Sequence, residues 1–176
     1  PLGRGIWAIV RPSLATGFST LSAPVGGVDL RFDGTFGATL ASALTGHNVL
    51  GQGDEVFILN PDSTYSNLYL DGSGTWRATT PGNPVAHHVL APGQGLVVLR
   101  RQGTAAQPEF RGPVGNSMNQ TNVMHPGYNI VGLSEGRYVS LSTAFSSLIS
   151  GAPAGSYNQT QADSIIVLET SGAYTF

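Results

Sequence analysis

The clearest pattern in the chain is a short apolar run that opens with an acidic residue and occurs twice. Residues 54–59 read Asp-Glu-Val-Phe-Ile-Leu, and residues 163–168 read Asp-Ser-Ile-Ile-Val-Leu. Short apolar runs that are rich in β-branched residues and bounded by turn residues predict buried strands. The two runs begin 109 positions apart (163 − 54), and Tyr65 and Tyr174 have the same spacing (174 − 65). Self-similarity at a fixed offset predicts a duplicated unit.

Other segments between turn-rich stretches are also typical of strands. Those that follow residues 54–59 are separated only by the turns Asn60–Ser63 and Asp71–Gly74, so we expect an antiparallel meander. The stretch Gln102–Val123 is rich in Gly, Pro, Asn and Gln, and we expect it to be an inserted loop. The other predicted strands are Ile6–Val10, Gly17–Pro24, Tyr65–Leu70, Thr75–Thr79, an edge strand at His87–Leu90, Gly93–Arg100 and Gly127–Leu133.

Each copy carries one segment with helical spacing. Phe36, Leu40 and Leu44 recur at i, i+4 and i+8, which places them on one face of a helix. Gly46 is a plausible C-terminal stop for this helix. The matching segment of the second copy is residues 142–151, which contains Phe145 at the 109-residue offset (145 − 36). We therefore expect one short helix in each copy, closing an end of the β structure.

The pattern as a whole predicts an all-β, mainly antiparallel fold. Many short strands joined by Gly/Pro turns are typical of a β-sandwich or barrel. We expect it to be built from two copies of a small β unit, residues 1–91 and residues 92–176, packed as one globular unit. The second copy is expected to be C-terminally incomplete.

An incomplete second copy predicts an exposed sheet edge, which a soluble monomer must cover. The strand at Ile6–Val10 could close the fold within its own molecule, or it could be added to the sheet of a neighbour. Repetition of the second arrangement builds an open filament. The residues expected at this closure or subunit interface are Ile6, Trp7, Ala8, Ile9, Val10, Tyr174 and Phe176.

The amino-acid composition argues against some binding partners and favours one location. Charged residues make up only 10% of the 176 residues, against about 25% in typical domains. The net charge is −2, so nothing favours nucleic acid or an anionic membrane as a partner. No apolar run reaches the roughly 18 residues of a membrane span, and no signal peptide is visible. The absence of cysteine, with abundant Gly, Ser, Thr and Asn, favours an extracellular or cell-surface protein, of which this would be the mature chain.

No motif predicts catalysis, so we expect a protein that is not an enzyme and has no cofactor or metal. The chain lacks a Gly-x-Ser-x-Gly elbow, and without lysine it has no Ser-x-x-Lys. The adjacent His87 and His88 would point to opposite faces of a strand, which disfavours a shared metal. Asp71–Gly74 resembles a fragment of a calcium loop but equally suits a hairpin turn.

Two further groups of residues are compatible with carbohydrate, either attached to the protein or bound by it. Asn119 and Asn158 begin Asn-x-Thr triplets and are candidate glycosylation sites. The aromatic residues suit either a β core or a platform on which sugars stack, with the core interpretation favoured. These aromatic residues are Trp7, Tyr65, Tyr69, Trp76, Tyr138 and Tyr174.

Three groups of residues resemble a family of secreted β-rich bacterial proteins of unassigned function, known chiefly from verrucomicrobial-type bacteria. The first is Gly53-Asp54-x-Val56-Phe57 with the Tyr65 hairpin and Trp76; the second is Leu90-x-Pro92-Gly93-x-Gly95 with its strand ending at Arg100; the third is Gly127-Tyr128-Asn129-Ile130-Val131-Gly132. The resemblance implies export and a surface or structural role, and it implies no catalytic residues.

Together these patterns predict a non-enzymatic extracellular structural protein, a self-assembling subunit of a filament, pilus-like fibre or surface layer. Its partners would be copies of itself, with a glycan as a further partner. One alternative is a carbohydrate-binding or adhesin module. A second is a virion component, such as a capsid or tail-tube subunit.

Overall fold

The computed structural model describes residues 7–22, 29–60, 62–91, 94–113, 129, 167–168 and 174–175. The chain divides into two compact units, residues 1–136 and residues 137–176. In the second unit, β8 (Val167–Leu168) pairs antiparallel with β9 (Tyr174–Thr175). All other described elements belong to the first unit. In the described part of the chain, no helix is long and apolar enough to cross a membrane.

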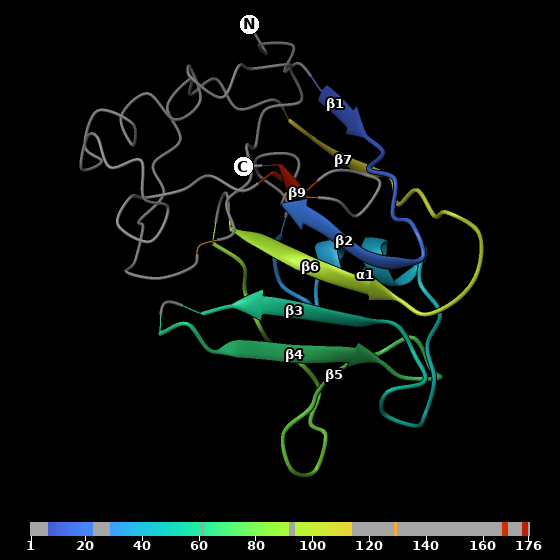
Figure 1. Cartoon of the computed structure of the whole chain (residues 1–176), viewed down its shortest axis with the longest axis vertical. Helices are drawn as coiled ribbons and strands as arrows, with labels where there is room; N and C mark the ends of the chain where they lie inside the picture. Colours follow the sequence, from blue (N-terminus) through green and yellow to red (C-terminus); the bar gives the residue numbers. More distant parts are fainter. Residues whose placement is uncertain are drawn as a thin grey trace, which may run out of the picture. The chain divides into compact units, whose positions relative to one another are not determined.

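The first unit is organised around a five-stranded antiparallel sheet (Figure 1). Its middle strand, β3, covers Glu55–Leu59, within the acidic-apolar run. The predicted meander is confirmed, because β3 pairs with β4 and β4 with β5. The spatial order is β2 (Gly17–Ser22), β6 (Gly95–Arg100), β3, β4 (Tyr65–Leu70) and β5 (Trp76–Ala78).

Helix α1 (Thr35–Ala41) covers one face of this sheet. Its residues Phe36 and Leu40 are fully buried, which confirms the predicted apolar face. Leu44 lies beyond the helix end but still packs against the core. Glycine at position 37 lets α1 lie close to the backbone of Phe32, because a Cβ atom at this position would lie 1.9 Å from the Phe32 carbonyl oxygen.

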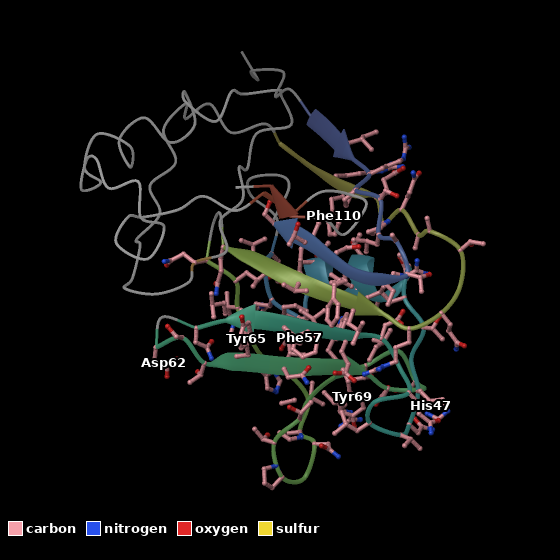
Figure 2. All side chains as sticks on the ribbon, viewed as in Figure 1. His47, Phe57, Asp62, Tyr65, Tyr69 and Phe110 are labelled. Atoms are coloured by element: carbon pink, nitrogen blue, oxygen red, sulfur yellow. The ribbon has the colours of Figure 1, made fainter. Side chains whose placement is uncertain are left out.

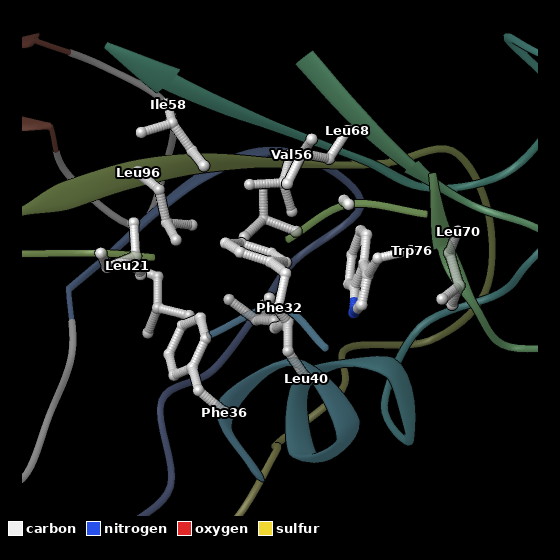
Figure 3. Packing of buried hydrophobic residues seen from close by; sticks show 14 of the residues in the cluster. Leu21, Phe32, Phe36, Leu40, Val56, Ile58, Leu68, Leu70, Trp76 and Leu96 are labelled. Carbon is white, nitrogen blue, oxygen red and sulfur yellow. The ribbon is translucent and has the colours of Figure 1, made fainter. Parts of the chain in front are cut away.

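The core lies between the sheet and α1, with Phe32 near its centre (Figure 3). The Phe32 ring packs edge-on against the rings of Phe36 and Trp76, with centroids 5.6 Å and 5.2 Å apart. Trp76 Nε1 donates a hydrogen bond to the Gly37 carbonyl at 2.8 Å. The one polar atom of this indole is therefore satisfied, which lets the large side chain lie in the core.

A second antiparallel pair continues the β2–β6 ladder. Strand β1 (Trp7–Val10) pairs with β7 (Phe110–Pro113), and an isolated bridge joins Leu14 to Ala106 in the same register. The expectation that Gln102–Val123 is entirely loop is wrong, because β7 lies within it. Phe110 explains the difference: its ring is buried and stacks on Phe36 at 5.3 Å, so packing draws this segment into the core.

The predicted edge strand at His87–Leu90 is also wrong. Only single bridges form here, between Val85 and Arg77 and between Val89 and Arg31. The Ala86 N–H donates to Trp76 on β5, whereas the Leu90 N–H donates to the Leu30 carbonyl. Because the segment changes its hydrogen-bonding partner within a few residues, it cannot continue one ladder.

The described residues are mostly β, as predicted, with an antiparallel sheet and one short helix. Of the predicted strand 127–133 only Asn129 is described, and the second helix, at residues 142–151, lies outside the described residues. The division at residue 91 stays a prediction. Strand β6, which follows that boundary, lies between β2 and β3, which precede it.

Candidate functional site

The sheet has a second face, opposite α1, which we call the outer face. Side chains alternate along a strand, so residues that alternate with the core residues Val56 and Ile58 lie on the outer face. Figure 2 labels three of its aromatic residues, on β3 and β4. The apolar residues at outer-face positions are Phe18, Phe57, Leu59, Tyr65, Tyr69, Val97 and Leu99.

An aromatic pair lies on the outer face near the β2 edge of the sheet. The rings of Phe18 and Phe57 have centroids 6.3 Å apart and are tilted by 53°. Phe18 is directly opposite Leu99 and Phe57 directly opposite Val97, so the apolar side chains run across three adjacent strands. Phe18 is 62% exposed.

Polar side chains border this apolar area on β3 and β4. The carboxylate of Glu55 is buried and accepts hydrogen bonds from Arg101 Nη2 at 2.5 Å and from Asn67 Nδ2 at 3.2 Å. The Asn67 Oδ1 atom is buried and has no hydrogen-bond partner among the residues that the structure describes. The outer face thus carries a partly buried ion pair and a polar amide beside its aromatic residues.

Asp54 holds together the end of the sheet next to this ion pair. Its side chain is 1% exposed, and its two oxygens accept hydrogen bonds from the backbone N–H groups of Thr45 and Arg101, each at 2.8 Å. The acidic start of the run therefore joins two loops to β3. Both carboxylates of the Asp54-Glu55 pair are engaged in structural hydrogen bonds.

Arg100 occupies a bend in the long ladder formed by β1–β7 and β2–β6. Between Gly17↔Arg100 and Leu14↔Ala106, residues 15–16 on one side face residues 101–105 on the other. The Arg100 guanidinium lies in this bulge and donates to the carbonyls of Leu14 at 2.7 Å and Thr104 at 2.8 Å. Gly17 has a φ of +93° here, which favours glycine at the bend.

The two edges of the five-stranded sheet differ. The β5 edge is short and is covered by the following loop, which donates and accepts hydrogen bonds at Trp76 and Ala78. It also carries Arg77, which is paired with Asp71 at 2.8 Å. The β2 edge pairs with β6 alone in the part of the chain that the structure describes. No charged residue lies between Arg11 and Asp29.

The predicted closure residues are described in part. Trp7, Ala8, Ile9 and Val10 form β1, which pairs within the same chain with β7; the Ile9 side chain is 54% exposed. Tyr174 lies in β9, opposite Leu168, in the second unit. The remaining candidates, Ile6, Phe176 and the glycosylation sites Asn119 and Asn158, lie outside the described residues. The sequence placed Arg100 at the end of an apolar strand but did not predict its buried structural role.

Two of the aromatic residues considered for a sugar platform are too buried to form one. Trp76 and Tyr69 are 3% and 5% exposed, so both belong to the packed structure, whereas Tyr65 is 56% exposed. Tyr138 lies outside the described residues. Trp7 is described as part of β1, but its side chain is not. The core interpretation of Trp76 is confirmed by its position in the hydrophobic cluster.

The Asp71–Gly74 segment forms the hairpin turn between β4 and β5. One oxygen of Asp71 accepts hydrogen bonds from the N–H groups of Ser73 and Thr75, each at 2.9 Å, and the other pairs with Arg77. Burial opposes ionisation of Asp71, but hydrogen bonds from Ser73 and Arg77 outweigh it and hold its pKa well below the usual range. Among the described residues, no three His, Asp or Glu side chains are grouped so that they could hold a metal ion.

The chain matches no protein-family model, no curated protein and no solved structure.

Proposed function

We propose that this protein is a non-enzymatic structural subunit that assembles with copies of itself outside the cell. The observation that carries the proposal is the β2 edge, an uncharged strand whose outward side pairs with no other described strand. Natural proteins usually protect such edges, because they offer unpaired N–H and C=O groups to another chain. The partly exposed aromatic residues next to this edge support association rather than isolation.

The β1–β7 pair supports the same proposal. Two-stranded ribbons are marginally stable alone, so an added strand stabilises them. Ile9 on β1 is exposed, and Arg11 and Arg111 flank Glu109 on the ribbon's surface. In the proposed assembly, β1 completes a β-sandwich or barrel of two related units, either within its own molecule or in a neighbour. The low charge and the resemblance to secreted β-rich proteins fit this role.

The test is negative-stain electron microscopy of the native protein, with its mass measured by light scattering. Ordered fibres or sheets are the expected result. A variant that lacks residues 1–11 loses β1 and the Arg11–Glu109 ion pair, and it should fail to assemble. A protein that stays monomeric at all concentrations would contradict the proposal. A deletion variant that polymerises normally would show that β1 is not needed for assembly.

A second candidate function is glycan binding on the outer face. The observation that favours it is the exposure of Phe18 and Tyr65 on the outer face, where Asn67 supplies a polar side chain on the same strand as Tyr65. Apolar ring faces combined with a few polar groups are the usual means of holding a small polar ligand. Saturable binding of an oligosaccharide by the monomer, lost in a Phe18→Ser variant, would support this function. Binding that Phe18→Ser leaves unchanged would contradict it.

A further inference from the structure

We infer that β2 pairs antiparallel with β2 of a second copy, joining two five-stranded sheets into one. The inference rests on the proposed self-assembly and names the surface through which it occurs. That surface, the β2 edge, consists of Gly17–Ser22 together with the side chain of Phe57 beside it. Such an interface is isologous, meaning that the same patch of each molecule contacts its copy.

The first argument is that, among the described residues, the β2 edge shows none of the devices that block strand addition. Protected edges are short, bulged, covered by a loop, or carry charged residues or proline. β2 is six residues long, pairs regularly with β6 along its whole length, and contains neither charge nor proline. The opposite edge, β5, is three residues long, carries Arg77 and is covered by the loop that contains Val85.

The second argument is that β2 is complementary to itself. In an isologous antiparallel pair, residues near the middle of the strand lie opposite their own copies or near neighbours, so a charge there would face a like charge. No charged residue lies between Arg11 and Asp29, so this repulsion does not arise. A partner that recognised the edge by charge would find no group to bind. The observations therefore favour a second copy of this chain as the occupant.

The third argument is the position of Phe18. Its side chain is 62% exposed and lies on the outer face of the outermost strand. The ring of Phe57 lies on the same face, next to Phe18 and nearer the middle of the sheet. A two-fold axis perpendicular to the sheet keeps the outer faces of both copies on the same side. Phe18 and Thr20 of one copy then lie beside those of the other, and aromatic residues in such cross-strand positions stabilise strand pairs.

The sharpest experiment uses the absence of cysteine from the chain. The full chain with Thr20→Cys presents one thiol on the exposed outer side of the β2 edge. Treatment with a short bis-maleimide should convert this variant to a covalent dimer. Thr80→Cys is the matched control, because it also replaces an exposed threonine but lies next to the protected β5 edge. This control should stay monomeric on denaturing gels.

A matched pair of charge variants tests the same contact without a cross-link. Thr20→Lys and Thr80→Lys change the net charge equally, but only Thr20→Lys places two like charges at the proposed two-fold contact. Sedimentation velocity should show at least tenfold weaker association for Thr20→Lys and no change for Thr80→Lys. The circular dichroism spectrum of each variant checks that it folds.

The outcomes separate the inference from the proposed function. If the wild-type protein associates but Thr20→Cys gives no more cross-linked dimer than Thr80→Cys, the β2 contact is overturned and self-assembly stands. If the wild-type protein does not associate at any concentration, both the β2 contact and the proposed self-assembly are contradicted. Efficient cross-linking of Thr20→Cys together with weakened association of Thr20→Lys supports both.

Discussion

The two edges of the five-stranded sheet differ in how far the described residues cover them. At the β5 edge, Trp76 is buried in the core, Arg77 is paired with Asp71, and the next loop satisfies the backbone. At the β2 edge, the backbone of Gly17–Ser22 bonds to β6 alone among the described residues, and Phe18 is exposed. The difference lies in strand length, in the loop that bonds to the β5 backbone and in side-chain chemistry, although both edges belong to the same sheet.

The largest expected effect is at the closed edge. Replacing Trp76 with alanine removes a buried indole that packs on Phe32 and bonds to Gly37. Large-to-small changes of this kind cost about 3–5 kcal/mol of stability. We expect a corresponding fall in the free energy of unfolding, measured by urea denaturation. A loss below about 1 kcal/mol would contradict the role of Trp76 as the anchor of β5.

The next effect concerns the open side, where Arg100 holds the bend between β2–β6 and β1–β7. Arg100→Met removes the side-chain donor to the carbonyls of Leu14 and Thr104, of which Leu14 keeps its bond from the Ala106 N–H, and it removes the cation 4.0 Å from the buried Asp54. Unsatisfied buried groups cost about 1–3 kcal/mol each, so we expect a loss of about 3 kcal/mol in urea denaturation. Arg111→Met, at an exposed ion pair, is the control and should change stability by less than about 1 kcal/mol.

A smaller effect is expected in the hairpin that shapes the closed edge. Asp71→Asn removes the charge that pairs with Arg77 and weakens the bonds from Ser73 and Thr75, at an expected cost of about 2 kcal/mol at neutral pH. The pKa of Asp71 is lowered in the folded protein, so its stabilising effect is present above the unfolded value of 3.8 and is lost as pH falls below it.

The measurement for Asp71 is urea denaturation of both proteins between pH 2 and pH 7. The stability difference between the wild-type protein and Asp71→Asn should shrink once the pH is below about 4. A difference that stays constant across this range would show that the loss arises from packing and not from charge.

The smallest effect concerns His88, in the segment that follows the loop covering β5. Its ring packs against Phe32, with centroids 6.4 Å apart, and burial lowers its pKa. A histidine whose pKa is lowered by folding stabilises the protein fully above the unfolded value of 6.5, and this stability is lost as pH falls through the window below 6.5. Thermal unfolding of His88→Gln between pH 5 and pH 8 should therefore depend less on pH than that of the wild-type protein.

The local elements of the first unit could be read from the sequence because their signals are local. The run at residues 54–59, the turns that follow it and the spacing of Phe36 and Leu40 each depend on residues close together in the chain. The site was less predictable. The sequence indicated that Ile6–Val10 forms a strand, but the position of β2 at the edge of the described sheet became visible only when the strand order was known.

The sequence alone predicted a mainly antiparallel β fold and a short helix with a buried face, both seen in the described residues, and it carries no charged residue between Arg11 and Asp29. The tertiary structure decided that β6 lies between β2 and β3, that β7 lies in a predicted loop, and that Arg100 is buried in a bulge. Periodicity and turn chemistry act over a few residues. Strand order and burial depend on contacts between residues far apart in the chain, which no local pattern encodes.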